Sequence, residues 1–271
     1  MITLSVGDTT LVVAPDLGSS VQRFRVGTVD VLRVGQPDLR NPLEMSSFPL
    51  VPWCNRIIDG RFEWDGRLVD VGGTPLVGEP HGLHGHGWLW RWDVVEETRE
   101  SLLLEYLHPA GRWPWRYRAR HRLEIEPGRL SQTLSVENLS DTAMPLALGF
   151  HPYFERPGRL TANVDGFWTG DDVIPDRWEE RQPFRSTDVD RTGLDNTFTH
   201  WDGRALIDVP GGRVELWSDL PMVHLFTPAG RGFFCVEPTE AVPGALNFGS
   251  RGGRLLEPGQ TGSGSMRIAF I

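Results

Sequence analysis

Apolar and polar residues alternate with a period of two along most of the chain, which is the pattern of half-buried β-strands. In residues 122–138 this alternation runs up to Pro127-Gly128 and resumes after it, which predicts a hairpin with one buried face. Residues 61–71 repeat the arrangement around Asp65-Gly66, a strong signal for a two-residue turn. Further short strands are predicted at 101–107, 144–150, 204–209, 213–217, 222–226, 232–237 and 266–270.

No segment has the period of an amphipathic helix over several turns, and the best candidate for a short helix is residues 186–196. Many strands without intervening helices predict an all-β fold, a large antiparallel β-sandwich. Residues 155–200 are polar and weakly patterned, and we expect them to form a long excursion over one end of it. Sandwiches often reach 200–250 residues as one unit, so we expect residues 1–271 to form a single domain.

The formal net charge is −9, which disfavours binding to nucleic acids and to anionic membrane surfaces. No apolar run approaches the length of a membrane span, and the N-terminus lacks the pattern of a signal peptide. Cys54 and Cys235 are far apart and match no metal-binding spacing. Two thiols in a chain of this length indicate a reducing compartment, so we expect a cytoplasmic protein.

Five short segments place polar residues among Gly, Pro and aromatic residues. They are PWCNRIIDGRF (52–62), HGLHGHGW (81–88), GFHPYF (149–154), LDNTF (194–198) and CVEPTEAVPGALN (235–247). Taken in this order, they resemble the aldose 1-epimerase (galactose mutarotase) family, with GFHPYF the most diagnostic. The resemblance implies a mutarotase-like supersandwich that interconverts the α and β anomers of a free aldose and uses no cofactor.

This reaction requires a base for the C1 hydroxyl and an acid for the ring oxygen, and a carboxylate and a histidine make a suitable pair. The resemblance implies that Glu237, at the end of an apolar strand, is the base, and that His151 is the acid. Glu240 is a nearby competitor for the role of base. Without the resemblance, an exposed strand-end carboxylate and a buried histidine bonded to a carbonyl are the simpler interpretations of Glu237 and His151.

The same resemblance implies a set of residues that bind the sugar. Arg56 donates to sugar hydroxyls, His84 binds the sugar near its ring oxygen, and Asp195 accepts from a vicinal diol, with Asn55 beside Arg56 as a further contact. From the residues alone, Arg56 is equally a surface charge and Asp195 equally a turn residue.

One departure from the family pattern is His86, which makes a cluster with His81 and His84. Histidine is the commonest metal ligand in such clusters, but the intervening glycines make this a loop and no carboxylate stands at a fixed spacing. We therefore expect no metal, and we expect His86 to influence which sugar fits.

The sequence leaves open three alternatives to an epimerase of free aldoses. A non-catalytic carbohydrate-binding protein would use the same Trp and Arg contacts, but would not need a paired Glu and His. A cupin-like, metal-dependent sugar isomerase would use the histidine cluster and would lose activity with a chelator. An epimerase acting on a phosphorylated or sulfonated sugar would need a cationic pocket for the anionic group.

Overall fold

Antiparallel strands make up most of the protein in the computed structural model, which describes residues 1–36, 41–164, 166–169, 174, 177–180, 184–188, 193–249 and 252–271. A nine-stranded sheet has the order β10-β11-β12-β13-β27-β23-β22-β17-β20. Its strands are β10 (Asp93–Glu97), β11 (Ser101–His108), β12 (Tyr117–Glu126), β13 (Arg129–Asn138), β27 (Thr261–Phe270), β23 (Gly212–Ser218), β22 (Arg204–Val209), β17 (Arg159–Ala162) and β20 (Phe184–Asp188).

An eight-stranded sheet has the order β19-β18-β21-β24-β25-β15-β5, and β16 also pairs with β25. Its strands are β19 (Arg177–Glu180), β18 (Gly166–Thr169), β21 (Asp195–Thr199), β24 (Met222–Phe226), β25 (Phe233–Thr239), β15 (Gly149–Phe150), β5 (Pro49–Leu50) and β16 (Tyr153–Glu155). The first residues form a four-stranded sheet of β1 (Ile2–Val6), β2 (Thr9–Ala14), β3 (Ser20–Val26) and β4 (Val29–Asp30).

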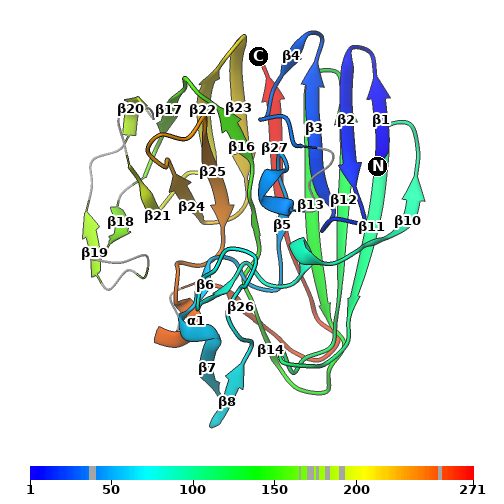
Figure 1. Cartoon of the computed structure of the whole chain (residues 1–271). Coiled ribbons are helices and arrows are strands. Elements are labelled where there is room, and N and C mark those ends of the chain that lie inside the picture. The colour runs from blue at the N-terminus through cyan, green and yellow to red at the C-terminus, as the bar shows by residue number, and fades with distance from the viewer. Residues whose placement is uncertain are drawn as a thin grey trace.

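Short elements gather at one end of the large sheets, at the bottom of Figure 1. They are the strand pairs β6 (Arg56–Ile57) with β9 (Gly82–Leu83), β7 (Arg61–Trp64) with β8 (Arg67–Asp70), and β14 (Met144–Leu146) with β26 (Arg254–Leu256), together with helix α1 (Ala245–Phe248). Single 3-10 turns occur at Pro42–Glu44, Ile58–Gly60 and Gly87–Leu89. No helix of the described residues is long and apolar enough to cross a membrane.

The alternation in the sequence corresponds to the buried faces of these sheets. In the β12–β13 hairpin, Ile125 pairs with Leu130 across the turn, and both side chains are buried. The turn of the β7–β8 hairpin places both Asp65 and Gly66 at positive φ, as a two-residue hairpin turn requires. One core cluster runs from Leu4 in β1 to Ile268 in β27. The all-β prediction is therefore confirmed.

Residues 155–200 differ from the expectation for this region. Their described parts are strands that extend both large sheets: β17 and β20 at the edge of one, and β18, β19 and β21 at the edge of the other. The short helix predicted at 186–196 is wrong for the described residues, because 184–188 pair with β17 and 195–198 pair with β24. Residues 189–192 lie outside the described residues.

Candidate active site

Asn55 and His84 hold each other in place at one wall of the site. Both have left-handed backbones, with φ of 58° and 59°. The Asn55 N–H donates to Nδ1 of His84 over 3.1 Å, and the His84 N–H donates to the Asn55 carbonyl over 3.0 Å. Because Nδ1 accepts, the proton of neutral His84 lies on Nε2. Gly85 follows at φ 73°, where a Cβ atom would lie 2.1 Å from the Val51 carbonyl oxygen, so the turn requires glycine.

His151 stands at the end of β15, in contact with two aromatic rings. Its backbone N–H donates to the Phe48 carbonyl over 3.1 Å, and its imidazole lies 4.6 Å from the rings of both Phe48 and Tyr153. Its Nε2 lies 3.4 Å from Oε1 of Glu237 on β25. The apolar residues that surround Glu237 in its strand leave both side chains almost without solvent contact.

This burial sets the proton affinity of the pair. Burial raises the pKa of Glu237 to about 8, although positive His224 acts against the rise. Burial also lowers the pKa of His151 well below 6.5, and the positive charge of His224 adds to that effect. Near neutral pH, the two groups together therefore hold one proton, which rests on Glu237. Glu237 Oε2 and His151 Nδ1 have no hydrogen-bond partner among the described residues.

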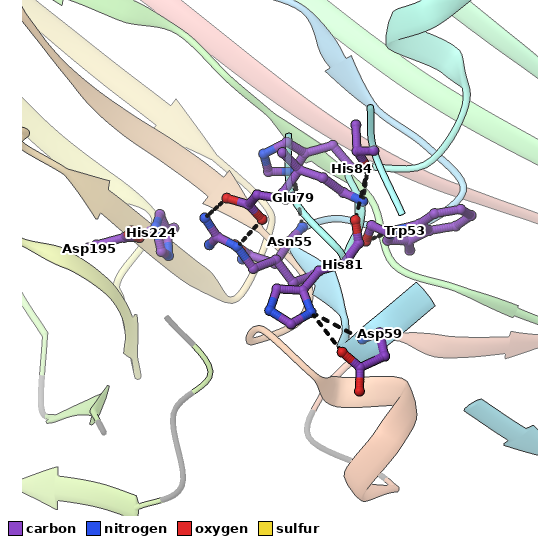
Figure 2. Close-up of polar contacts among 12 residues, drawn as sticks. Trp53, Asn55, Asp59, Glu79, His81, His84, Asp195 and His224 are labelled. Carbon is purple, nitrogen blue, oxygen red and sulfur yellow. Dashed lines mark hydrogen bonds and ion pairs between the residues drawn. The ribbon is translucent and has the colours of Figure 1, made fainter. Parts of the chain in front are cut away.

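Arg56 is held by a carboxylate at the mouth of the site. Its Nε and Nη2 donate to the two oxygens of Glu79, each over 2.9 Å, in the fork geometry that suits a guanidinium (Figure 2). The Arg56 side chain is only 12% exposed and Glu79 28%. The ion pair fixes the direction of Arg56 and offsets its charge, and the remaining N–H groups of Arg56 are left for a ligand.

Asp195 lies at the start of β21 and is bound to His224 of β24. His224 and Asp195 lie side by side (Figure 2), with Nε2 of His224 2.9 Å from Oδ1 of Asp195. Nδ1 of the same ring lies 2.8 Å from the Thr197 hydroxyl. Although burial acts to raise it, the hydrogen bond from His224 lowers the pKa of Asp195 below its usual range. Asp195 is therefore an anion with one oxygen already engaged.

These side chains surround a cavity of about 180 Å³. It is smaller than the roughly 300–1,000 Å³ of sites for drug-sized ligands, and this size suits one sugar ring. The residues that line it are Leu43, Asn55, Arg56, Val77, Glu79, Leu83, His84, His151, Tyr153, Asp195, His224, Phe226 and Glu237.

The structure thus brings six of the seven residues singled out from the sequence to one cavity: Glu237, His151, Arg56, His84, Asp195 and Asn55. Glu240, the competitor for the role of base, is buried elsewhere. One of its oxygens accepts from the Leu148 N–H over 2.7 Å, and the other pairs with Arg254. These contacts give Glu240 a structural position beside the strand that carries His151.

His86 is not among the residues that line this cavity, in contrast to the expectation that it influences which sugar fits. The left-handed backbone at His84 and Gly85 turns the chain, and the His86 N–H is fixed to the Val51 carbonyl over 2.8 Å. Its ring stacks on His108 with centroids 4.5 Å apart, and burial lowers the pKa of His86 to about 3. The position of His86 therefore does not support a contact between its side chain and a sugar in the cavity.

Among the described residues, His81 and His86 belong to no group of side chains whose spacing could hold a metal ion together with His84. Nδ1 of His81 accepts from the Asp59 N–H over 3.0 Å (Figure 2). A different group, His84, His151 and Glu237, has three potential ligand atoms within 4.8 Å of one another. His151 Nε2 and Glu237 Oε1 lie 3.4 Å apart, close to the roughly 3.3 Å between ligands around a tetrahedral zinc at about 2.0 Å, so a chelator test decides between a metal and proton transfer at this group.

The sequence reasoning missed Glu79, Tyr153 and His224 as parts of the site. Tyr153 belongs to the GFHPYF segment, and His224 is the one polar residue within the predicted strand at 222–226. A histidine in the middle of an apolar strand was the available signal for His224. Nothing local marks Glu79, since its contact with Arg56 depends on the pairing of β6 with β9.

An antiparallel β-sandwich with a buried imidazole–carboxyl pair in a small polar cavity defines a galactose mutarotase-like protein. The family model for aldose 1-epimerase matches residues 1–269, and the chain belongs to this family. YphB of Escherichia coli K12, an uncharacterized protein, is 32% identical over 99% of both chains. YihR of the same organism, also uncharacterized, is 30% identical over 77% of this chain and 74% of its own.

Solved structures show the same fold. An Escherichia coli K12 protein superposes with a TM-score of 0.91 at 30% identity, covering 99% of this chain and 98% of its own. A galactose mutarotase-like protein from Clostridium acetobutylicum superposes with a TM-score of 0.86 at 20% identity, covering 99% and 94%. Family and fold together support a mutarotase-like function.

Proposed function

We propose that this protein is an aldose 1-epimerase that interconverts the α and β anomers of a free aldose by acid/base ring opening and reclosure. The observation that carries the proposal is the His151–Glu237 contact of 3.4 Å at a buried cavity for one sugar ring. A protein that only binds a sugar has no need for this pair, whose burial costs free energy, and ionisable groups with strongly shifted pKa values in a cavity are typical of catalytic sites.

Ring opening places each group in a definite role. Glu237, as a carboxylate, takes the proton of the C1 hydroxyl while His151, as an imidazolium, gives its proton to the ring oxygen. The bond from C1 to the ring oxygen breaks and the C1 carbonyl forms. The Nε2–H of His84 is available to the same ring oxygen or to a neighbouring hydroxyl.

Ring closure uses the other state of the pair. After rotation about the C1–C2 bond, His151 recovers the proton from the C5 hydroxyl and Glu237 returns a proton to the carbonyl oxygen. The pair carries one proton before and after each step, so no external acid or base is consumed. The resting form, with the proton on Glu237, is the closing form, and proton transfer within the pair produces the opening form.

The charges at the cavity favour an uncharged sugar over a phosphorylated or sulfonated one. Arg56 is the one Arg or Lys among the lining residues of the described structure, and Glu79 offsets its charge. Asp195 is a further anion of the cavity, and Glu237 is a second carboxyl that becomes an anion when it loses its proton. An anionic substituent would meet these carboxylates, and the two cations of the cavity, Arg56 and His224, are each already paired with a carboxylate, Glu79 and Asp195.

Exchange between anomer signals in NMR spectra, recorded with glucose, galactose, a deoxy sugar and glucose 6-phosphate, tests the proposal. We expect enhanced exchange for at least one uncharged sugar, unchanged by EDTA, and a loss of about 10²–10⁴-fold in Glu237→Gln. No enhancement with any sugar would contradict the proposal. Activity lost in EDTA and restored by a divalent metal would favour the metal-dependent alternative at His84, His151 and Glu237.

A further inference from the structure

The His224 ring is bound on both sides by one neighbouring strand. Its Nε2 faces the Asp195 carboxylate at 2.9 Å, and its Nδ1 faces the Thr197 hydroxyl at 2.8 Å. An ionised carboxylate only accepts, so Nε2 carries a proton. The hydroxyl either donates or accepts, so the arrangement accommodates the imidazolium. With both nitrogens engaged, His224 acts on a sugar through its neighbours.

One of these neighbours is Glu237. His224 and Glu237 are direct partners in the β24–β25 register, and both line the cavity. Directly opposite residues of antiparallel strands have Cβ atoms roughly 4.5–5.5 Å apart on one face of the sheet. The His224 side chain is 4% exposed and that of Glu237 2%, so water screens their interaction poorly.

The charged and titratable groups that face His224 divide into two sets. Asp195 and Glu237 favour the imidazolium, and Arg56 and the other two histidines of the cavity oppose it. Burial acts to lower the pKa of His224, but the hydrogen bond to Asp195 and the negative charge of Glu237 raise it above 6.5. The ion pair with Asp195 is thus the largest of the contributions that raise the pKa of His224.

We propose that Asp195, His224 and Thr197 form a positioning unit that holds a positive charge against Glu237 and thereby sets the pH range in which the His151–Glu237 pair holds its single proton. The role given to Asp195 by family resemblance is extended, because its Oδ1 serves His224 and only Oδ2 is left for a sugar hydroxyl. This inference rests on the proposed epimerase function for its kinetic readout.

Removing the charge while keeping a hydrogen-bonding side chain tests the unit. His224→Gln is compared with His121→Gln, a matched control in which another buried histidine bonds Ser19 and Gln132 away from the cavity. A cation roughly 5–6 Å from a carboxyl, at an effective dielectric constant of about 20, changes its proton affinity by about two pH units. Both limbs of the kcat/KM profile are expected to move upward by this amount in His224→Gln, with no movement in the control.

A folded His224→Gln protein whose pH profile superimposes on that of the wild type would overturn the inference. ¹⁵N NMR of the wild-type imidazole groups gives a second measurement that needs neither a variant nor a substrate. Both nitrogens of His224 are expected in the imidazolium range at pH 6, and a neutral ring there would also overturn it. An imidazolium signal in a protein without anomer exchange would show that the proposed function fails while the charged unit stands.

Discussion

The pH dependence of the reaction follows from the one-proton state of the His151–Glu237 pair. Burial raises the pKa of Glu237 to about 8, so the pair keeps its proton below this value and loses it above. Since both ring opening and ring closure need that proton, activity is present below pH 8 and is lost as the pH rises through it. The occupied fraction is about one tenth at pH 9 and about one hundredth at pH 10, for a single titration with this pKa.

The assay is kcat/KM for anomer exchange between pH 5 and pH 10, after subtraction of the spontaneous rate in each buffer. This ratio reports the groups of the free protein, which is the state that the structure describes. We expect a decline of about tenfold per pH unit above 8, and a second decline well below 6.5 as His151 gains a further proton. A profile that rises through pH 8 would refute the shared-proton reasoning, because it would show that the fully deprotonated pair is the active form.

Three substitutions test other parts of the structure. Glu79→Gln is expected to raise KM about tenfold with little change in kcat, because Arg56 loses a charge-assisted pair worth roughly 1.5–3 kcal/mol; an unchanged KM would contradict this role. His86→Ala is expected to lower the free energy of unfolding by about 1 kcal/mol, because the stacking on His108 is lost. A change in sugar preference in this variant would contradict the purely structural role and indicate that His86 influences sugar binding. Glu240→Gln is expected to cost about 1–3 kcal/mol in a denaturant titration, while the pH profile keeps its alkaline limb near 8; a shifted limb would reopen the role of Glu240 as the base.

The strands were predictable from the sequence where burial on one face imposes a period of two. Ile125 and Leu130 face the core across a turn that Pro127-Gly128 marks, so local residues and the final packing agree there. Residues 184–188 lack this pattern because they form an edge strand, whose pairing with β17 is decided by the rest of the sheet.

The site residues that belong to a sequence motif could be predicted from the sequence. The residues whose place in the site depends on contacts between distant segments could not. Motif resemblance singled out Glu237 and His151, but no local pattern states that their atoms meet. His86 illustrates the limit, because its neighbour His84 lines the cavity while the turn at Gly85 directs His86 to His108. Such a reversal depends on two backbone dihedral angles that the sequence does not display.

The pieces of the site come from opposite ends of the chain, and this has a consequence for folding. The Asn55 side chain donates to the Ala241 carbonyl over 3.4 Å, and the Gly244 N–H donates to the Arg56 carbonyl over 2.7 Å. Contacts of such sequence separation form slowly, since a long loop must close before they contribute. During synthesis, about 190 further residues must be added after the segment around Asn55 before its partner residues exist. Chaperone dependence and aggregation of truncated chains are therefore expected to accompany this arrangement.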